Sequence, residues 1–117
     1  MDSISLAGQL RMRGIPILGW ITIGRCIRAF HDLGVCHPDL NAHNILLGES
    51  GQVFVLDFDR GRIRERGAWE KSVLARLQRS LLKIQRQRSG VNFGERDWEA
   101  LMAGYEFETR DARRETR

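Results

Sequence analysis

Residues 37–44 read His-Pro-Asp-Leu-Asn-Ala-His-Asn, and the interpretation of the whole chain starts from this polar stretch. Its proline and its many polar side chains predict a structured loop over residues 35–44, and the charged residues 57–67 predict a second, mobile or ligand-facing loop. Two apolar runs follow at residues 45–47 and 53–56, with Gly-Glu-Ser-Gly at positions 48–51 between them. Two β-favouring runs around a short turn predict a β-hairpin that begins directly after the loop.

Side chains with oxygen donors stand at both ends of the predicted hairpin. Asp39 and Asn44 precede it and Asp57 follows it, so the hairpin can bring the three together. Carboxylate and amide oxygens suit Mg²⁺, a hard cation that also binds substrate phosphates. A carboxylate beside a metal-bound phosphate can orient and deprotonate an attacking hydroxyl. The same residue types also cap loops and stabilise turns at strand ends, and the spacing alone leaves that alternative open.

Helical periodicity lies on either side of the loop and hairpin. Apolar residues at three- and four-residue intervals predict helices over residues 18–33 and 69–87, and Gly34 is suited to end the first of them. We also expect a shorter helix over residues 96–105 and a charged tail over residues 109–117 that frays. This order of elements predicts a mostly helical α+β fold.

The composition is that of a single globular domain. Hydrophobic residues make up 42% of the 117 residues and charged residues 29%, which is too apolar for a disordered chain. The longest apolar runs are far shorter than the ~20 residues that span a bilayer, and we expect no secretory signal in the first nine residues. Two cysteines, Cys26 and Cys36, make neither a disulfide framework nor a four-ligand metal site, so we expect free thiols in the cytoplasm.

The chain is basic, with 19 Lys and Arg residues against 15 Asp and Glu residues and a net charge of +4. Most of these cations are arginines, which suit bidentate contact with phosphates, so we expect an anionic partner. Four of these arginines alternate along the sequence, so in an extended loop they would lie on one side: Arg60, Arg62, Arg64 and Arg66. They are either solvated or in contact with phosphorylated lipid head groups. Base-stacking aromatic residues do not lie among the basic residues, so we expect no nucleic-acid partner.

The loop and the hairpin together resemble the catalytic half of the protein-kinase-like superfamily. That superfamily's catalytic loop reads His-Arg-Asp-Leu-x-x-x-Asn, and four of its named positions recur here in register: His37, Asp39, Leu40 and Asn44. Pro38 stands where arginine is usual, and Asp-Phe-Asp at residues 57–59 replaces the Asp-Phe-Gly that follows the hairpin in the superfamily. The resemblance implies a protein-kinase-like carboxyl-terminal lobe, mostly α-helical, whose short β-hairpin carries the catalytic and metal loops.

The fuller wording of residues 20–83 is similar to the 3-deoxy-D-manno-octulosonic acid (Kdo) kinase family. This resemblance implies ATP-dependent phosphorylation of an alcohol group, the 4-hydroxyl of the Kdo sugar on lipid A, in lipopolysaccharide core biosynthesis. The expected cofactors are ATP and Mg²⁺, and the expected partners are Kdo-lipid A and an anionic membrane surface. The expected location is cytoplasmic, peripheral on the inner membrane of a Gram-negative bacterium.

The resemblance also implies roles for individual residues. Asp39 would be the catalytic base, while Asn44 and Asp57 would bind Mg²⁺ and thereby the nucleotide. His37 would support the loop. Three further residues are candidates for contact with the sugar or its phosphates, although a surface or packing role is an alternative for the first: His43, Asp59 and Arg60.

The chain departs from the superfamily pattern at its amino-terminal end. Kinases carry a Gly-rich phosphate loop and a Lys–Glu ion pair before the catalytic loop, and the 38 residues before Asp39 contain no Gly-x-Gly-x-x-Gly pattern and no lysine. We therefore expect residues 1–117 to be a single partial domain, a carboxyl-terminal lobe without its amino-terminal nucleotide lobe, that binds ATP poorly alone. Two alternatives stay open: a kinase for another sugar or small molecule, and a non-catalytic fragment that binds a partner lobe or a lipid surface.

Overall fold

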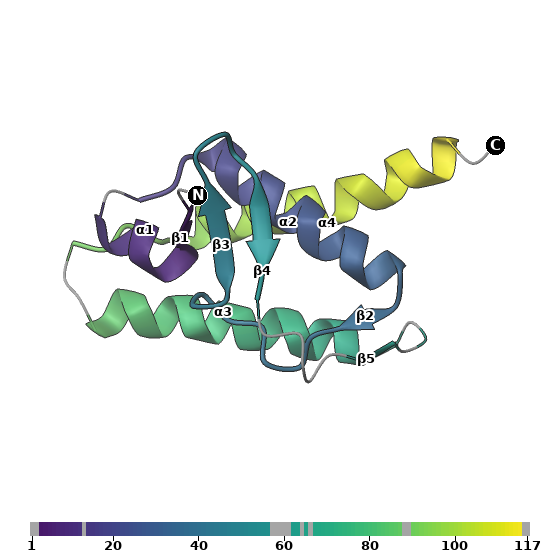
Figure 1. Ribbon diagram of the computed structural model, residues 1–117, viewed down its shortest axis with the longest axis horizontal. Coiled ribbons are helices and arrows are strands. Elements are labelled where there is room, and N and C mark those ends of the chain that lie inside the picture. Colours follow the sequence, from purple (N-terminus) through teal and green to yellow (C-terminus); the bar gives the residue numbers. More distant parts are fainter. Residues whose placement is uncertain are drawn as a thin grey trace.

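The computed structural model describes residues 3–12, 14–56, 62–63, 65, 67–87 and 90–115, and its elements follow in the order β1, α1, α2, β2, β3, β4, β5, α3, α4 (Figure 1). The helices are α1 (Leu6–Met12), α2 (Ile17–Asp32), α3 (Trp69–Gln87) and α4 (Glu95–Glu115). The strands are β1 (Ser3–Ser5), β2 (Val35–Cys36), β3 (Ile45–Gly48), β4 (Val53–Val55) and β5 (Arg62–Ile63). The expected mixture of helices with a small antiparallel sheet is confirmed, and so are the positions of α2 and α3.

The predicted hairpin is formed by β3 and β4. Its antiparallel register pairs Ile45 with Val55 and Leu47 with Val53. At the turn, Gly48 N donates a 2.8 Å hydrogen bond to Gln52 O, and Gly51 has a φ of +85°, a left-handed conformation that glycine adopts at little cost. The other edge of β3 pairs with β1, which gives a three-stranded sheet that the weakly periodic amino-terminal segment did not predict.

A second, two-stranded sheet pairs β2 with β5 and lies next to the loop of residues 37–44. Sequence patterns predicted only loops in both places, and that expectation is wrong at these residues. Each strand is two residues long, which is too short for a period of two to be visible in the sequence. The pairing connects the end of α2 to the segment that follows β4.

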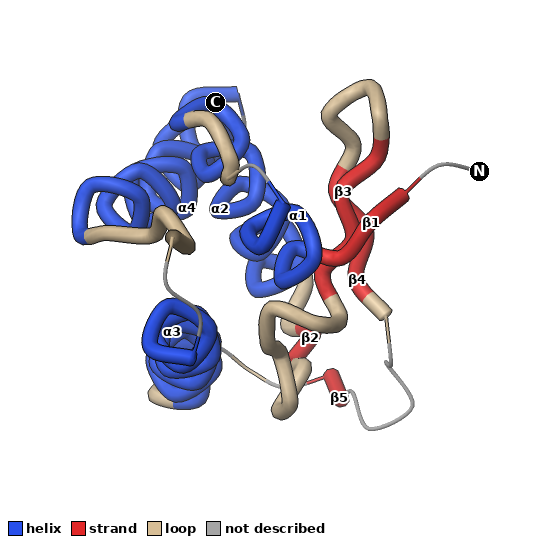
Figure 2. Tube along the Cα trace, turned by 90° about the vertical axis from the view of Figure 1, so that its left-hand side faces the viewer, coloured by secondary structure: helices blue, strands red, loops and turns tan. Residues whose placement is uncertain are grey.

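The most extensive helix packing is between α2 and α4, which Figure 2 shows side by side. A methyl group added at Gly24 would collide with the backbone carbonyl oxygen of Leu101, and one added at Gly104 would collide with that of Ile21. The two glycines therefore allow the backbones of the helices to approach closely. The α4 helix also runs ten residues past its predicted end, so residues 109–115 of the predicted tail belong to a helix, and the fraying of this tail stays a prediction. Most residues in this stretch are good helix formers such as Glu, Arg and Ala, and they outweigh the lack of an apolar stripe.

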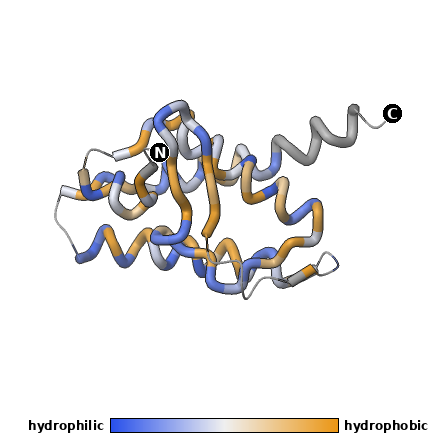
Figure 3. The backbone as a smooth tube through the Cα atoms, in the orientation of Figure 1, coloured by the Kyte–Doolittle hydropathy of each residue, from blue (hydrophilic) through white to orange (hydrophobic). Residues whose placement is uncertain are grey.

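The core lies between the helices and the inner face of the sheet. Apolar residues repeat along α3 and along both hairpin strands (Figure 3), and the α3 stripe is buried: Val73, Leu77, Leu81 and Ile84. Trp20 of α2 is fully buried with its ring centroid 5.3 Å from that of Phe93. Both cysteines are free, as expected, and burial raises the pKa of the Cys26 thiol above its ordinary value of 9.0. Among the described helices, none is both long enough and apolar enough to cross a bilayer.

Candidate active site

The loop of residues 37–44 is held in shape by two asparagine side chains. Asn41 Nδ2 and Asn44 Nδ2 both donate hydrogen bonds to the carbonyl oxygen of Asp39, at 2.8 and 3.1 Å. In return, the backbone amide of Asn41 donates to Asn44 Oδ1 at 3.0 Å, and the amide of His43 donates to Asn41 Oδ1 at 2.8 Å. These bonds replace the backbone pairing that the loop cannot make as a helix or strand. The backbone on either side of Asp39 is therefore fixed.

The same loop is attached to two helices through Ala42, which is fully buried. Ala42 N donates a 3.0 Å hydrogen bond to Ser80 Oγ of α3, and Ser80 Oγ in turn donates to Leu77 O at 2.8 Å. On the other side, Ala7 N at the start of α1 donates to Ala42 O at 2.9 Å. Both backbone polar groups of this buried residue are satisfied, so the loop has a defined position between α1 and α3.

His37 joins the loop to the end of the hairpin. It is 4% exposed, and its Nε2 donates a 2.7 Å hydrogen bond to the carbonyl oxygen of Leu56. Leu56 N donates to Asn44 O at 2.8 Å. The residue directly before Asp57 is therefore held by both ends of the loop, and His37 has the supporting position expected for it.

Asp39 is partly exposed to solvent on this loop, next to buried residues. Its side chain is 49% exposed, whereas Leu40 next to it is 3% exposed. Its Oδ1 lies 3.7 Å from Nη1 of Arg76, a residue of α3. An accessible carboxylate on a fixed backbone can meet a hydroxyl group of a ligand and accept its proton.

The structure brings together the predicted site residues that it describes. Asp39 and Asn44 share the hydrogen-bonded loop, and His43 is exposed on the same loop. Three other predicted site residues lie outside the described part of the chain: Asp57, Asp59 and Arg60. Their roles stay predictions, and so does the shared side predicted for the loop arginines.

The described donors fit a hard cation in part. Asn44 Oδ1 accepts one hydrogen bond, from Asn41 N, and an amide oxygen has a second lone pair that can bind a metal. Asn44 is 6% exposed, so this oxygen belongs to a buried polar cluster rather than to open surface. Within the described residues there is no group of three His, Cys, Asp or Glu side chains placed to hold a metal.

Two residues of α3, Ser80 and Arg76, were not identified as site residues from the sequence. A signal for Ser80 is present, because a small polar residue interrupts the apolar stripe between Leu77 and Leu81. Arg76 is one of several arginines on the polar side of α3, and nothing in its spacing distinguishes it from the others. Its position beside Asp39 follows from the tertiary structure alone.

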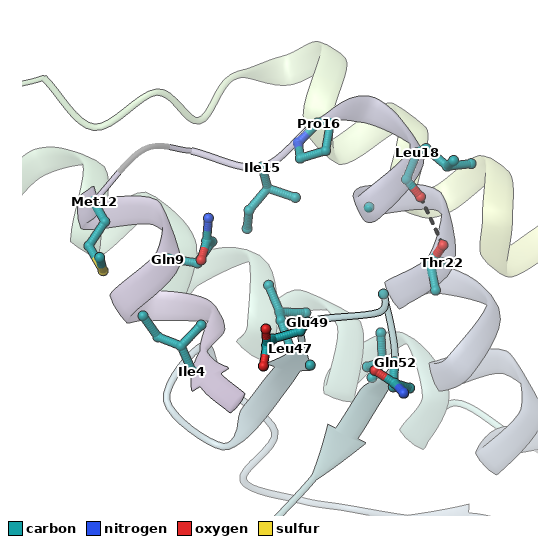
Figure 4. A pocket seen from close by; sticks show the side chains of 14 residues that line it. Ile4, Gln9, Met12, Ile15, Pro16, Leu18, Thr22, Leu47, Glu49 and Gln52 are labelled. Atoms are coloured by element: carbon teal, nitrogen blue, oxygen red, sulfur yellow. Dashed lines mark hydrogen bonds between the residues drawn. The ribbon is translucent and has the colours of Figure 1, made fainter. Parts of the chain in front are cut away.

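A cleft of about 770 Å³ lies away from Asp39, between the hairpin turn and the connection from α1 to α2 (Figure 4). Apolar side chains such as Ile15, Leu18 and Leu47 line it together with the amides of Gln9 and Gln52. Among the described residues that line it, Glu49 is the only ionisable one. Apart from Glu49, the described lining of the cleft therefore carries no acid–base group, and we place the candidate active site at the Asp39 loop.

A family model described as "Lipopolysaccharide kinase (Kdo/WaaP) family" matches residues 15–105 of the chain. This range contains the whole Asp39 loop, the hairpin and α3.

Curated proteins with the name 3-deoxy-D-manno-octulosonic acid kinase are similar to the chain. The protein from Photobacterium profundum is 43% identical over 102 residues, which cover 87% of this chain and 43% of that protein. The protein from Xylella fastidiosa (strain M23) is 51% identical over 89 residues, covering 75% of this chain and 35% of the relative. The protein from Xanthomonas oryzae pv. oryzae (strain PXO99A) is 44% identical over 106 residues, covering 90% and 41%. The chain thus spans about two-fifths of the length of these relatives.

Proposed function

We propose that this chain carries the catalytic centre of a kinase that phosphorylates a hydroxyl group of the sugar Kdo. The proposal starts from the family, because the chain belongs to the lipopolysaccharide kinase (Kdo/WaaP) family. ATP would be the phosphoryl donor. In the finer form of the proposal the acceptor is the 4-hydroxyl of Kdo on lipid A, within lipopolysaccharide core biosynthesis. The chain would then act as a carboxyl-terminal lobe on the cytoplasmic face of the inner membrane, and an amino-terminal lobe would complete the nucleotide site.

The observation that carries the proposal is the setting of Asp39. Its carboxylate is half exposed, while its own carbonyl oxygen accepts hydrogen bonds from Asn41 and Asn44. The asparagine side chains hold the loop backbone, and the Asp39 carboxylate is exposed enough to contact a ligand.

In the proposed reaction, Asp39 orients the acceptor hydroxyl and accepts its proton as the hydroxyl oxygen bonds to the terminal phosphorus of ATP, while the bond from that phosphorus to the β–γ bridging oxygen breaks and ADP leaves. Asn44 and Asp57 would hold Mg²⁺, which when bound neutralises charge on the phosphates. His37 and Ser80 fix the loop backbone so that Asp39 needs no rearrangement before the reaction.

The experiment is a phosphoryl-transfer assay with Asp39→Asn as the test variant. We would measure transfer from Mg·ATP to Kdo-lipid A by the chain and by a chimera of it. In that chimera, the chain is joined to the part of the Photobacterium profundum relative that it does not span. Asn keeps the shape of Asp39 but cannot accept the proton, so we expect the chimera to lose activity about 10²–10⁴-fold.

The control for this assay is Asp32→Asn, which changes another aspartate that lies at the end of α2 in an ion pair with Arg28. We expect that variant to keep its activity. A chimera that is inactive with an intact Asp39 would favour the non-catalytic fragment. A chimera that prefers another sugar would favour the second kinase alternative. An active Asp39→Asn variant, within a few-fold of the parent, would remove Asp39 from the proposed mechanism.

A further inference from the structure

Arg76 of α3 forms an ion pair with Asp39 that contributes little to folding. Its Nη1 is 3.7 Å from Asp39 Oδ1, beyond hydrogen-bond distance, and the two side chains are 52% and 49% exposed. Exposed pairs of this kind contribute little to the stability of a protein. A guanidinium group has five N–H donors, and at this exposure Arg76 has donors accessible to a ligand.

The position of Arg76 relative to the loop is fixed by a second contact. Ala42 N donates to Ser80 Oγ, one helical turn after Arg76. The two contacts pair residue 39 with residue 76 and residue 42 with residue 80, so the loop and α3 run in the same direction side by side. The position of α3 relative to the loop therefore places Arg76 next to Asp39, the proposed catalytic base.

Arg76 contacts the loop from α3, whereas the hairpin contacts it at Asn44. The carbonyl of Asn44 accepts a hydrogen bond from Leu56 N, and Nη1 of Arg76 lies 3.7 Å from Asp39 Oδ1. In phosphoryl transfer the attacking and leaving oxygens lie roughly in line, so the acceptor enters on the side remote from the nucleotide. If the nucleotide is bound at the hairpin side, Arg76 is on the acceptor side.

We infer that Arg76 binds the carboxylate of an acidic sugar acceptor and thereby selects acidic sugars over neutral ones. The inference rests on the proposed function, in which the acceptor is an octulosonic acid and therefore carries a carboxylate. Asp39 repels such an anion at close range, and a cation beside it offsets that repulsion. The planar guanidinium can also donate two parallel hydrogen bonds to a carboxylate, which fixes the orientation of the sugar.

The test measures ligand binding to the full 117-residue chain by titration followed by NMR. The probes are free Kdo and its neutral methyl ester, and the variants are Arg76→Gln and Arg76→Lys. Hydrogen bonds between charged groups contribute about 1.5–3 kcal/mol, so we expect Arg76→Gln to weaken Kdo binding about 10- to 100-fold. The variant should bind the ester as the parent does, and Arg76→Lys should recover part of the affinity for Kdo.

The matched control is Arg86→Gln, which removes an exposed arginine from the same helix about 15 Å farther along. We expect it to bind Kdo like the parent. Unchanged Kdo affinity in Arg76→Gln would overturn the inference, as would equal losses for Kdo and its ester, or a parent chain that binds neither probe. Weaker Mg·ATP binding with unchanged Kdo binding would assign Arg76 to the nucleotide and also overturn it. The proposed function is tested separately, by phosphoryl transfer in the chimera. It fails if the chimera transfers no phosphoryl group both with Arg76 and with the substituted residue.

Discussion

At Ala42, the backbone of the Asp39 loop passes through the interior of the protein, and the amide and the carbonyl of Ala42 are each satisfied by a different helix. The amide donates to Ser80 of α3 and the carbonyl accepts from Ala7 of α1. Burial of an unpaired backbone amide costs free energy comparable to a lost hydrogen bond. A single hydroxyl group therefore determines whether the loop can be buried at this point, three residues after Asp39.

We expect Ser80→Ala to reduce the free energy of unfolding by about 1–3 kcal/mol, because it leaves the buried amide of Ala42 without its partner. Denaturant unfolding measures the loss, and hydrogen exchange should show faster exchange at the Ala42 amide. The matched control is Ser72→Ala, an exposed serine of the same helix, where the better helix propensity of alanine should leave stability unchanged or slightly raised. Equal effects of the two substitutions would mean that the hydrogen bond to Ala42 contributes nothing.

At the scale of elements, the packing of α2 against α4 positions the Asp39 loop. The loop leaves the carboxyl end of α2 through Gly34, whose φ is +78° and whose amide donates to His31 O at 2.9 Å. The place of that helix end is set by the close approach at Gly24 and Gly104. Glycine is unfavourable in a helix by about 1 kcal/mol relative to alanine, and the packing of the two backbones offsets this cost.

We expect Gly104→Ala to destabilise the protein despite the better helix propensity of alanine, since its methyl group would collide with the backbone of Ile21. Overpacking of this kind typically costs about 1–3 kcal/mol, which exceeds the gain in propensity. Thermal unfolding compared with Gly94→Ala makes the test, because a methyl group at Gly94 meets no atom within 4 Å. A Gly104→Ala protein as stable as the parent would show that α2 and α4 can separate without cost.

At the scale of the whole molecule, His31 joins three helices that are distant in sequence. It belongs to α2 and is 2% exposed, and its Nδ1 is 2.7 Å from the hydroxyl oxygen of Tyr105 in α4. Its ring also makes an edge contact with Trp69 at the start of α3, with the centroids 4.9 Å apart. Arg28 lies over the Tyr105 ring at 5.0 Å and adds a cation–π contact. This polar cluster joins α2, which precedes the Asp39 loop, to α3, which carries Ser80 and Arg76.

We expect Tyr105→Phe to lower the unfolding free energy by about 1 kcal/mol or more, because it removes the buried hydrogen bond to His31 while keeping the aromatic ring. Equilibrium unfolding in urea gives the value. If the midpoint of unfolding does not change, the ring contacts alone hold the three helices together.

The sequence by itself determined the features that depend on neighbouring residues. The Asp39 loop, the hairpin and the long helices were predictable because turn residues, β-favouring runs and apolar stripes are local patterns. The roles of Asp39 and Asn44 are predictions from their order in the motif, and the structure places these two residues on one hydrogen-bonded loop. The actions of Asp57, Asp59 and Arg60 stay predictions from the same motif.

Only the tertiary structure decided which distant residues meet. The pairing of β1 with β3, the Gly24 and Gly104 contacts, and the approach of Ser80 and Arg76 to the loop join segments far apart along the chain. Such contacts leave no periodic signal, because a serine or an arginine on a helix has the same local pattern whether it faces solvent or a loop. The burial of the apolar faces of α2, α3 and the hairpin orients these polar residues, so their function depends on packing that the local sequence does not reveal.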